Sequence, residues 1–153
     1  MKKVIVLSRV STEGQDLTQQ TDEVLREVYK DGYTDSNIII IEDKESAIQL
    51  SEEERHGLNK MKEYISTNPN INCVYIYELS RLSRIPLVLY SIRDYLVERR
   101  IQLICLKPYF RLLEVDGTMS QTGSLMFSLF SSLAESEMMV GGLAATNTTL
   151  YKR

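Results

Sequence analysis

Short runs of apolar residues recur along the chain, and stretches with helical spacing separate them. Each run is four to six residues long, which suits a buried strand better than a helix. Between the runs, apolar positions recur every three or four residues, as on helices that pack against a sheet. This alternation predicts an α/β fold of three layers, with a central, mostly parallel sheet flanked by helices. The predicted buried strands are residues 4–7, 38–41, 73–77 and 101–106, with a short fifth strand at 110–115.

Three helices are predicted between these strands. The first ends at Asp31-Gly32, the second stops ahead of Pro69, and the third begins at Pro86. Glycine and proline are expected at such places because they interrupt a helix or fit its first turn. The polar, irregular stretch 42–54 predicts a loop. The inward-facing residues of the helices share the three-or-four spacing: Leu17, Thr21, Val24, Leu25 and Val28; Leu58, Met61 and Ile65; Leu89, Ile92, Tyr95 and Leu96.

A longer helix is predicted from Gln121 to Val140, where Gly141-Gly142 is expected to end it. Twenty residues of helix reach about 30 Å. The helix carries a wide stripe of apolar residues. One face of this stripe is expected to pack on the body of the domain and another on a partner helix, which predicts an oligomerisation helix. Phe127 is expected on another side. The stripe comprises Leu125, Met126, Leu129, Phe130, Leu133 and Met138.

Composition narrows the range of partners. The net charge is −3, and residues 138–150 contain neither lysine nor arginine, so avid and unspecific nucleic-acid binding by this chain alone is not expected. Cys73 and Cys105 lie within apolar runs and predict buried thiols in a reducing compartment. No apolar run approaches the roughly 20 residues of a spanning helix, and no signal peptide is visible, so a cytoplasmic protein without membrane contact is predicted.

The sequence also narrows the chemistry. His56 is the single histidine, and no cluster of ligands has metal-site spacing. Gly14 stands alone, so no phosphate loop of the nucleotide-binding type is present. We therefore expect neither a metal nor a small-molecule cofactor.

Serine and arginine remain as candidates for catalysis. Arg9 and Ser11 follow the first strand, and Arg81 and Arg84 follow the third. The carboxyl ends of parallel strands open on the same edge of a sheet, so three guanidiniums are expected to converge near one hydroxyl. Clustered guanidiniums repel one another unless an anion joins them, and a phosphodiester suits their planar donors. The pattern favours a serine nucleophile beside arginines that stabilise the charge of a five-coordinate phosphorus.

Five short motifs occur in order: LSRVSTEGQ at 7–15, DKESA at 43–47, RHGL at 55–58, LSRLSR at 79–84 and AESE at 134–137. Together they resemble the catalytic domain of the serine recombinases, the resolvase/invertase family of site-specific DNA recombinases. The resemblance implies Ser11 as the nucleophile, with Arg9, Arg55, Arg81 and Arg84 holding the phosphate. It also implies supporting positions at Gln15, Gln20, Ser46, Ser80 and Glu137.

The resemblance implies a reaction and an assembly. Ser11 would attack a scissile phosphate to form a phosphoserine link and a free 3′-hydroxyl, without a cofactor. Two homodimers would form a synaptic tetramer on DNA, exchange half-sites and reverse the chemistry, giving inversion, deletion or integration. Residues 1–140 are then the catalytic domain and 141–153 a tail, with no DNA-reading domain and hence weak DNA binding. The chain is expected to be an isolated catalytic domain, a truncated reading frame or a member that has lost recombination.

Three departures from the family pattern keep a second function open. Leu7 replaces the family tyrosine, and Ser80 replaces an aspartate to which the resemblance assigns a part in proton transfer. The tail lacks the family's arginine-rich helix. The alternative is a catalytically impaired relative that dimerises with, or regulates, active recombinases. A receiver-type phosphate switch shares the α/β alternation but needs acidic residues where this chain has Arg9 and Ser11.

Overall fold

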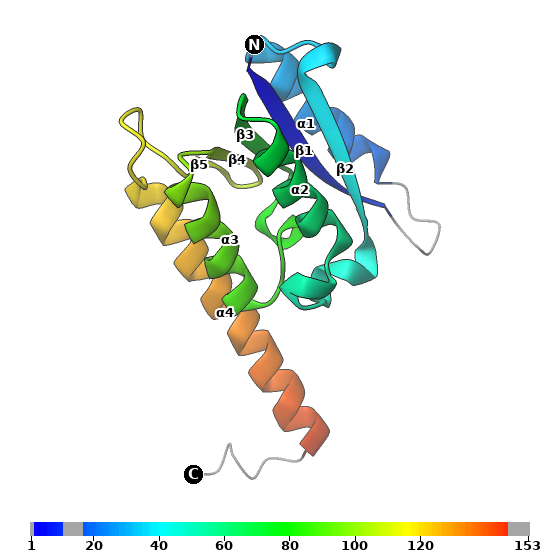
Figure 1. Ribbon diagram of the computed structural model, residues 1–153. Helices are drawn as coiled ribbons and strands as arrows, with labels where there is room; N and C mark the ends of the chain where they lie inside the picture. The colour runs from blue at the N-terminus through cyan, green and yellow to red at the C-terminus, as the bar shows by residue number, and fades with distance from the viewer. Residues whose placement is uncertain (1, 11–16, 147–153) are drawn as a thin grey trace.

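A five-stranded sheet forms the centre of the computed structural model, which describes residues 2–10 and 17–146 (Figure 1). The strands lie in the order β2-β1-β3-β4-β5. The first four are parallel, and β5 is antiparallel to β4, which confirms the predicted α/β class and the mostly parallel sheet. The strands are β1 (Lys3–Val10), β2 (Ile38–Lys44), β3 (Ile71–Ile76), β4 (Gln102–Leu106) and β5 (Tyr109–Arg111).

Helices cover both faces of this sheet and complete the three predicted layers. Successive residues of β1 point to opposite faces, so Val4 and Val6 pack with α1, whereas Ile5 and Leu7 pack with residues of α2, α3 and α4. The helices are α1 (Thr18–Lys30), α2 (His56–Thr67), α3 (Pro86–Glu98) and α4 (Gln121–Thr146). Short 3-10 helices are η1 (Asp35–Asn37), η2 (Glu45–Gln49), η3 (Glu52–Glu54) and η4 (Leu79–Arg81).

The prediction of a buried strand at 38–41 is wrong in its burial. β2 is the edge strand, pairs only with β1, and leaves Ile40 47% exposed. An apolar run marks a strand but does not say whether neighbours flank it on both sides. β1 lies between β2 and β3, β3 lies between β1 and β4, and both strands have fully buried apolar residues on both faces.

The stretch 42–54, predicted as a loop, is partly ordered in regular structure. Its first three residues continue β2, and η2 and η3 follow. Ser51 and Glu54 form a capping box at η3, in which the Ser51 hydroxyl and backbone N–H both donate to the Glu54 carboxylate. These local bonds organise a polar segment that has no apolar periodicity to reveal it.

The start of α4 is set by Ser120 and Gly123. The Ser120 hydroxyl donates to the Arg111 carbonyl oxygen at 2.7 Å and accepts the Gly123 N–H at 2.8 Å. A Cβ on Gly123 would lie 3.0 Å from the Leu112 Cα, so glycine permits this close approach. One turn later Phe127 is fully buried and meets Phe110 edge to face, with ring centroids 6.3 Å apart.

The predicted end of the long helix at Gly141-Gly142 is wrong. α4 continues through both glycines to Thr146, and its carboxyl-terminal half extends beyond the rest of the fold (Figure 1). Glycine costs only about 1 kcal/mol in a helix, and the alanines and leucine that follow favour the helical state. None of the helices within residues 17–146 is long and apolar enough to cross a membrane.

The stripe on α4 divides into two faces. Leu125, Leu129 and Leu133 are 53%, 50% and 63% exposed, whereas Met126 and Phe130 pack partly against the core. Phe127, expected on another side of the helix, is its most buried aromatic residue. The structure thus confirms that α4 carries more apolar surface than its own domain covers.

Candidate active site

The carboxyl ends of β1 and β3 meet beside α1 and enclose a small cavity of about 10 Å³. Arg9 is the penultimate residue of the lining strand β1, and Arg81 comes from η4, just after β3. On the α1 side, the Thr21 hydroxyl shares a 2.6 Å hydrogen bond with the Ser8 hydroxyl. The cavity is lined by Val6, Leu7, Ser8, Arg9, Gln20, Thr21, Val24, Tyr77 and Arg81.

Arg81 is the buried cation of this site. Its side chain is 2% exposed, and Nη2 donates to the Glu78 carboxylate. Its Nε and Nη1 are buried without a hydrogen-bond partner among the residues that the structure describes. Buried donors without partners are rare in folded proteins and costly, which makes them candidate ligands for an anion.

The charges of Arg9 and Arg84 act on Arg81. Burial lowers the pKa of Arg81, Glu78 raises it, and the positive charges of Arg9 and Arg84 lower it further. Arg9 and Arg84 therefore lie near enough to Arg81 for their charges to act on it, although Arg84 does not line the small cavity. Arg81 stays charged at neutral pH because an arginine cannot be deprotonated under ordinary conditions.

Glu78 is the counter-charge in this group. Its Oε1 accepts the Ser80 hydroxyl at 2.7 Å as well as the Arg81 guanidinium. Burial alone would raise the pKa of Glu78, but Ser80, Arg81 and Arg9 outweigh it and hold the pKa below its ordinary value. The carboxylate is therefore ionised at neutral pH.

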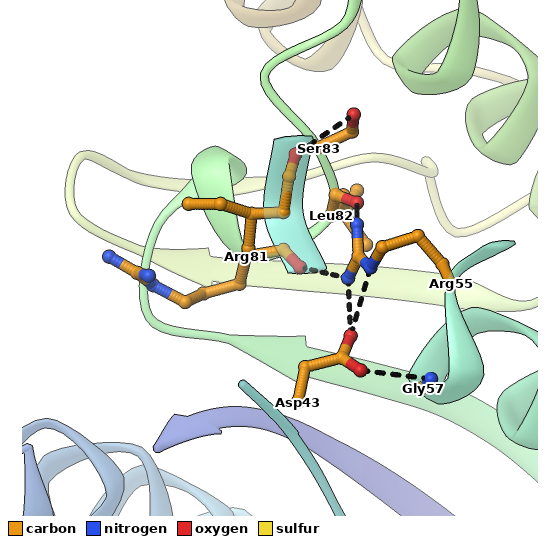
Figure 2. Close-up of polar contacts among 7 residues, drawn as sticks. Asp43, Arg55, Gly57, Arg81, Leu82 and Ser83 are labelled. Carbon is orange, nitrogen blue, oxygen red and sulfur yellow. Dashed lines mark hydrogen bonds and ion pairs between the residues drawn. The ribbon is translucent and has the colours of Figure 1, made fainter. Parts of the chain in front are cut away.

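Arg55 is fully buried next to the backbone of Arg81 (Figure 2). Nε and Nη2 donate to Asp43 Oδ2, the Nε bond being 3.1 Å long. Nη1 donates to the Leu82 carbonyl oxygen, and Nη2 also to that of Arg81 at 3.0 Å. Figure 2 shows the Arg81 guanidinium pointing away from Arg55. Arg55 thus holds the backbone of the Arg81 segment.

Asp43 joins this buried pair to the start of α2. Its Oδ1 accepts the Gly57 N–H at 2.9 Å, while Oδ2 accepts Arg55. A Cβ on Gly57 would overlap the Asp43 carboxylate. The spacing of arginine and glycine in RHGL therefore lets a carboxylate at the end of β2 bind a helix N-terminus and a guanidinium together.

The other predicted residues divide between this site and its surroundings. Gln20 lines the small cavity with Arg9 and Arg81. Ser46 is exposed on η2, and the Ile48 carbonyl of η2 accepts the Arg84 backbone N–H at 3.1 Å. Ser11 and Gln15 lie outside the described residues, as does the side chain of Glu137.

Sequence reasoning missed the roles of two carboxylates, Glu78 and Asp43. Glu78 directly precedes LSRLSR, and Asp43 opens DKESA. Glu78 was detectable because it directly follows the predicted strand 73–77 and precedes Arg81 by three residues. Asp43 was detectable only as an acidic residue just after the predicted strand 38–41. Their pairing with Arg81 and Arg55 depends on the folded chain.

A larger pocket of about 550 Å³, called the α4 pocket below, opens between the carboxyl ends of the strands and α4. One wall carries polar and charged residues of the strand ends, and the other carries apolar residues of α4. The pocket is lined by Glu78, Leu79, Ser80, Arg84, Lys107, Pro108, Met126, Leu129, Phe130 and Leu133. Glu78 and Ser80 thus lie in the wall between the Arg81 site and the α4 pocket.

Comparison with known proteins gives one family and several similar structures. The family model "Resolvase, N terminal domain" matches residues 4–140. The N-terminal catalytic domain of TP901-1 integrase is similar, with a TM-score of 0.63 and 25% identity over 91% of this chain and 98% of that one. A resolvase family site-specific recombinase from Streptococcus pneumoniae shares the fold, with a TM-score of 0.57 and 23% identity over 99% and 98%. No curated protein matches.

Proposed function

Because the chain belongs to the resolvase family of site-specific recombinases, we propose that it cleaves and rejoins DNA through a phosphoserine intermediate on Ser11. The family model matches residues 4–140, and membership of the family supports site-specific recombination as the general function. The serine mechanism and the roles of individual residues are our proposal. Similarity to the catalytic domain of an integrase agrees with DNA as the substrate.

The observation that carries the proposal is the buried Arg81 guanidinium, two of whose nitrogens have no hydrogen-bond partner among the described residues. Arg9 and Arg84 add positive charge, and Ser11 follows Arg9 by two residues. Guanidinium donors held in place before the reaction stabilise the charge that develops on a phosphorus under attack. The cavity admits a water-sized group, so the lining must part to seat a phosphate.

The reaction exchanges one phosphodiester for another. The Ser11 Oγ–P bond forms, the P–O3′ bond breaks, and its electron pair stays on the 3′ oxygen. The serine loses its proton and the leaving oxygen gains one. Because the new bond is also a phosphodiester, the attack of a 3′-hydroxyl can reverse the step without external energy. Arginines can supply the charge stabilisation that metal ions give in other phosphoryl-transfer enzymes.

Within this mechanism, Arg9, Arg81 and Arg84 contact the phosphate and Arg55 positions Arg81. This changes the role that the family resemblance implied for Arg55. Its N–H groups already bind Asp43 and two carbonyl oxygens, and its side chain has no exposed surface. Gln20 lines the cavity, from which its amide can reach the phosphate or Arg9.

A homodimer formed through α4, and a synaptic tetramer on DNA, complete the proposal. The exposed Leu125, Leu129 and Leu133 support it, because soluble proteins seldom leave such a strip in water. Twofold pairing would also present two copies of the active site to the two strands of one DNA site.

The experiment joins the full chain to a DNA-reading domain. Its substrate is a nicked suicide DNA whose recognition sites flank a randomised centre. We expect a covalent protein–DNA adduct from the wild type, and none from Ser11→Ala, although that variant still binds the DNA. Ser66→Ala removes an exposed hydroxyl of α2 and is the matched control. Adduct formation by Ser11→Ala would overturn the assignment. A wild type that binds without any adduct would favour the impaired relative.

A further inference from the structure

Glu78 closes a tight turn at the end of β3. Its carboxylate accepts hydrogen bonds from the residues two and three positions later, Ser80 and Arg81. Ser80 and Arg81 are buried, whereas the Glu78 side chain is 35% exposed. The carboxylate therefore lies at the boundary between the protein interior and the α4 pocket.

This turn determines which Arg81 donors remain. With Nη2 bound to Glu78, the described residues offer no partner to Nε and Nη1. Arginine side chains have many rotamers, and ordering one costs conformational free energy. The hydrogen bond to the Glu78 carboxylate orders the Arg81 side chain before a phosphate binds, so phosphate binding does not have to supply that free energy.

The charge of Glu78 also offsets part of the repulsion within the cluster. Arg9 and Arg84 each repel Arg81, and Glu78 attracts both Arg9 and Arg81. A neutral hydrogen-bond acceptor in place of the Glu78 carboxylate would keep the position of the Arg81 guanidinium but remove the negative charge that offsets the arginines. Shape and charge can therefore be tested separately.

We propose that Glu78 is a positioning residue of the recombination reaction: it holds Arg81 so that Nε and Nη1 are directed at the scissile phosphate. The inference rests on the proposed function. Glu78 does not contact the DNA in this role and acts only through Arg81. The Ser80 hydroxyl fixes the carboxylate, which gives Ser80 an indirect part in the same arrangement.

A purely structural role for Glu78 is the competing explanation. An ion pair three residues apart in a turn contributes little to stability when it is partly exposed. Such a role predicts small changes in unfolding and none in the reaction. A positioning role predicts a slower reaction at saturating DNA, with little change in the DNA concentration that gives half the maximal rate.

The experiment compares Glu78→Ala and Glu78→Gln with the matched control Glu52→Gln. Glu52 also accepts from a serine and a cation, Ser91 and Lys62, but lies outside the site. The first readout is the Nε–Hε NMR signal of Arg81 in the unmodified chain, assigned with Arg81→Lys and followed during titration with inorganic phosphate. The second is the rate of adduct formation in the fusion described above.

We expect Glu78→Ala to lose the distinct Arg81 signal and its response to phosphate. Its saturating rate should fall at least about tenfold. This is less than the roughly 10²–10³-fold cost of removing a preorganised donor, because Glu78→Ala misplaces the Arg81 guanidinium without removing it. Glu78→Gln keeps an acceptor of the same length and should recover much of the signal and rate. Glu52→Gln should match the wild type in both.

Two failures can be distinguished. An Arg81 signal and a rate that are unchanged in Glu78→Ala overturn the positioning role while leaving the recombinase reaction intact. A wild type that never forms an adduct overturns the reaction, and with it the role of Glu78 in that reaction. The NMR readout in that case still shows whether Glu78 orders Arg81.

Discussion

At the scale of single residues, two carboxylates determine what the arginines of the site can do. Asp43 binds Arg55 together with a backbone N–H of α2. Arg55 also donates to the carbonyl oxygens of Leu82 and Arg81, so this arginine supports the chain segment that carries Arg81. Glu78 binds Nη2 of Arg81, while Nε and Nη1 have no hydrogen-bond partner in the described part of the chain. Arginines that look equivalent in the sequence thus separate into a buried support and a group available to an anion.

The support role of Arg55 predicts a large stability effect. Arg55→Ala leaves the Asp43 carboxylate, which is 3% exposed, without its cation, and breaking such a buried pair costs about 3–5 kcal/mol. Arg93→Ala is the matched control. It breaks a more exposed ion pair with Asp94, for which about 0–1 kcal/mol is expected. Urea unfolding followed by circular dichroism measures both, and equal stability of the two variants would contradict the role.

At the scale of elements, α4 has one face in the core and one in solvent. Phe127 packs on Phe110, while Leu125, Leu129 and Leu133 follow one another at four-residue spacing on the exposed side. Both Leu129 and Phe130 line the α4 pocket, but Phe130 also packs partly on the core, whereas Leu129 is 50% exposed. Leu129 is therefore a cleaner probe of association than Phe130.

Leu129→Glu should convert a dimer into a folded monomer. The residue is 50% exposed, so a charge there costs little in the isolated fold but a great deal in an apolar interface. Sedimentation at hundreds of micromolar protein, where mass action favours association, measures the change. Phe127→Ala is the opposite control and should lose about 3–5 kcal/mol of unfolding free energy. A wild type that remains monomeric under these conditions rules out a stable α4 dimer.

At the scale of the whole molecule, positive charge is local while the net charge is negative. The arginines gather at one sheet edge, yet the chain carries −3 overall and no lysine or arginine in residues 138–150. Phosphate contacts along the backbone dominate DNA affinity. Chemistry and affinity are thus separate properties here, and the site can be selective for a phosphate without holding DNA tightly.

The isolated chain should accordingly bind DNA weakly. In a gel shift at physiological salt we expect no stable complex below about micromolar protein, the range of unspecific binding. The same chain joined to a DNA-reading domain should shift its target at much lower concentration. Nanomolar binding by the isolated chain would contradict this prediction and would point to a basic surface elsewhere on the domain.

The sequence by itself determined the elements and the edge where the arginines meet. Apolar runs marked the strands, Gly32 and Pro86 marked helix boundaries, and the alternation required Arg9 and Arg81 to leave the same edge of a parallel sheet. These features follow from local periodicity and from a general rule of sheet topology, both of which are visible in a linear chain.

The tertiary structure alone decided which strand is at the edge, how far α4 continues, and which carboxylate pairs with which arginine. Ile40 is exposed because no strand of the described residues pairs with the outer edge of β2. α4 passes through Gly141 because the cost of a glycine is small beside a continuous ladder of hydrogen bonds. Asp43 and Arg55, twelve residues apart, meet only because β2 and the start of α2 pack together. Burial and charge pairing depend on distances in space, which spacing along the chain does not encode.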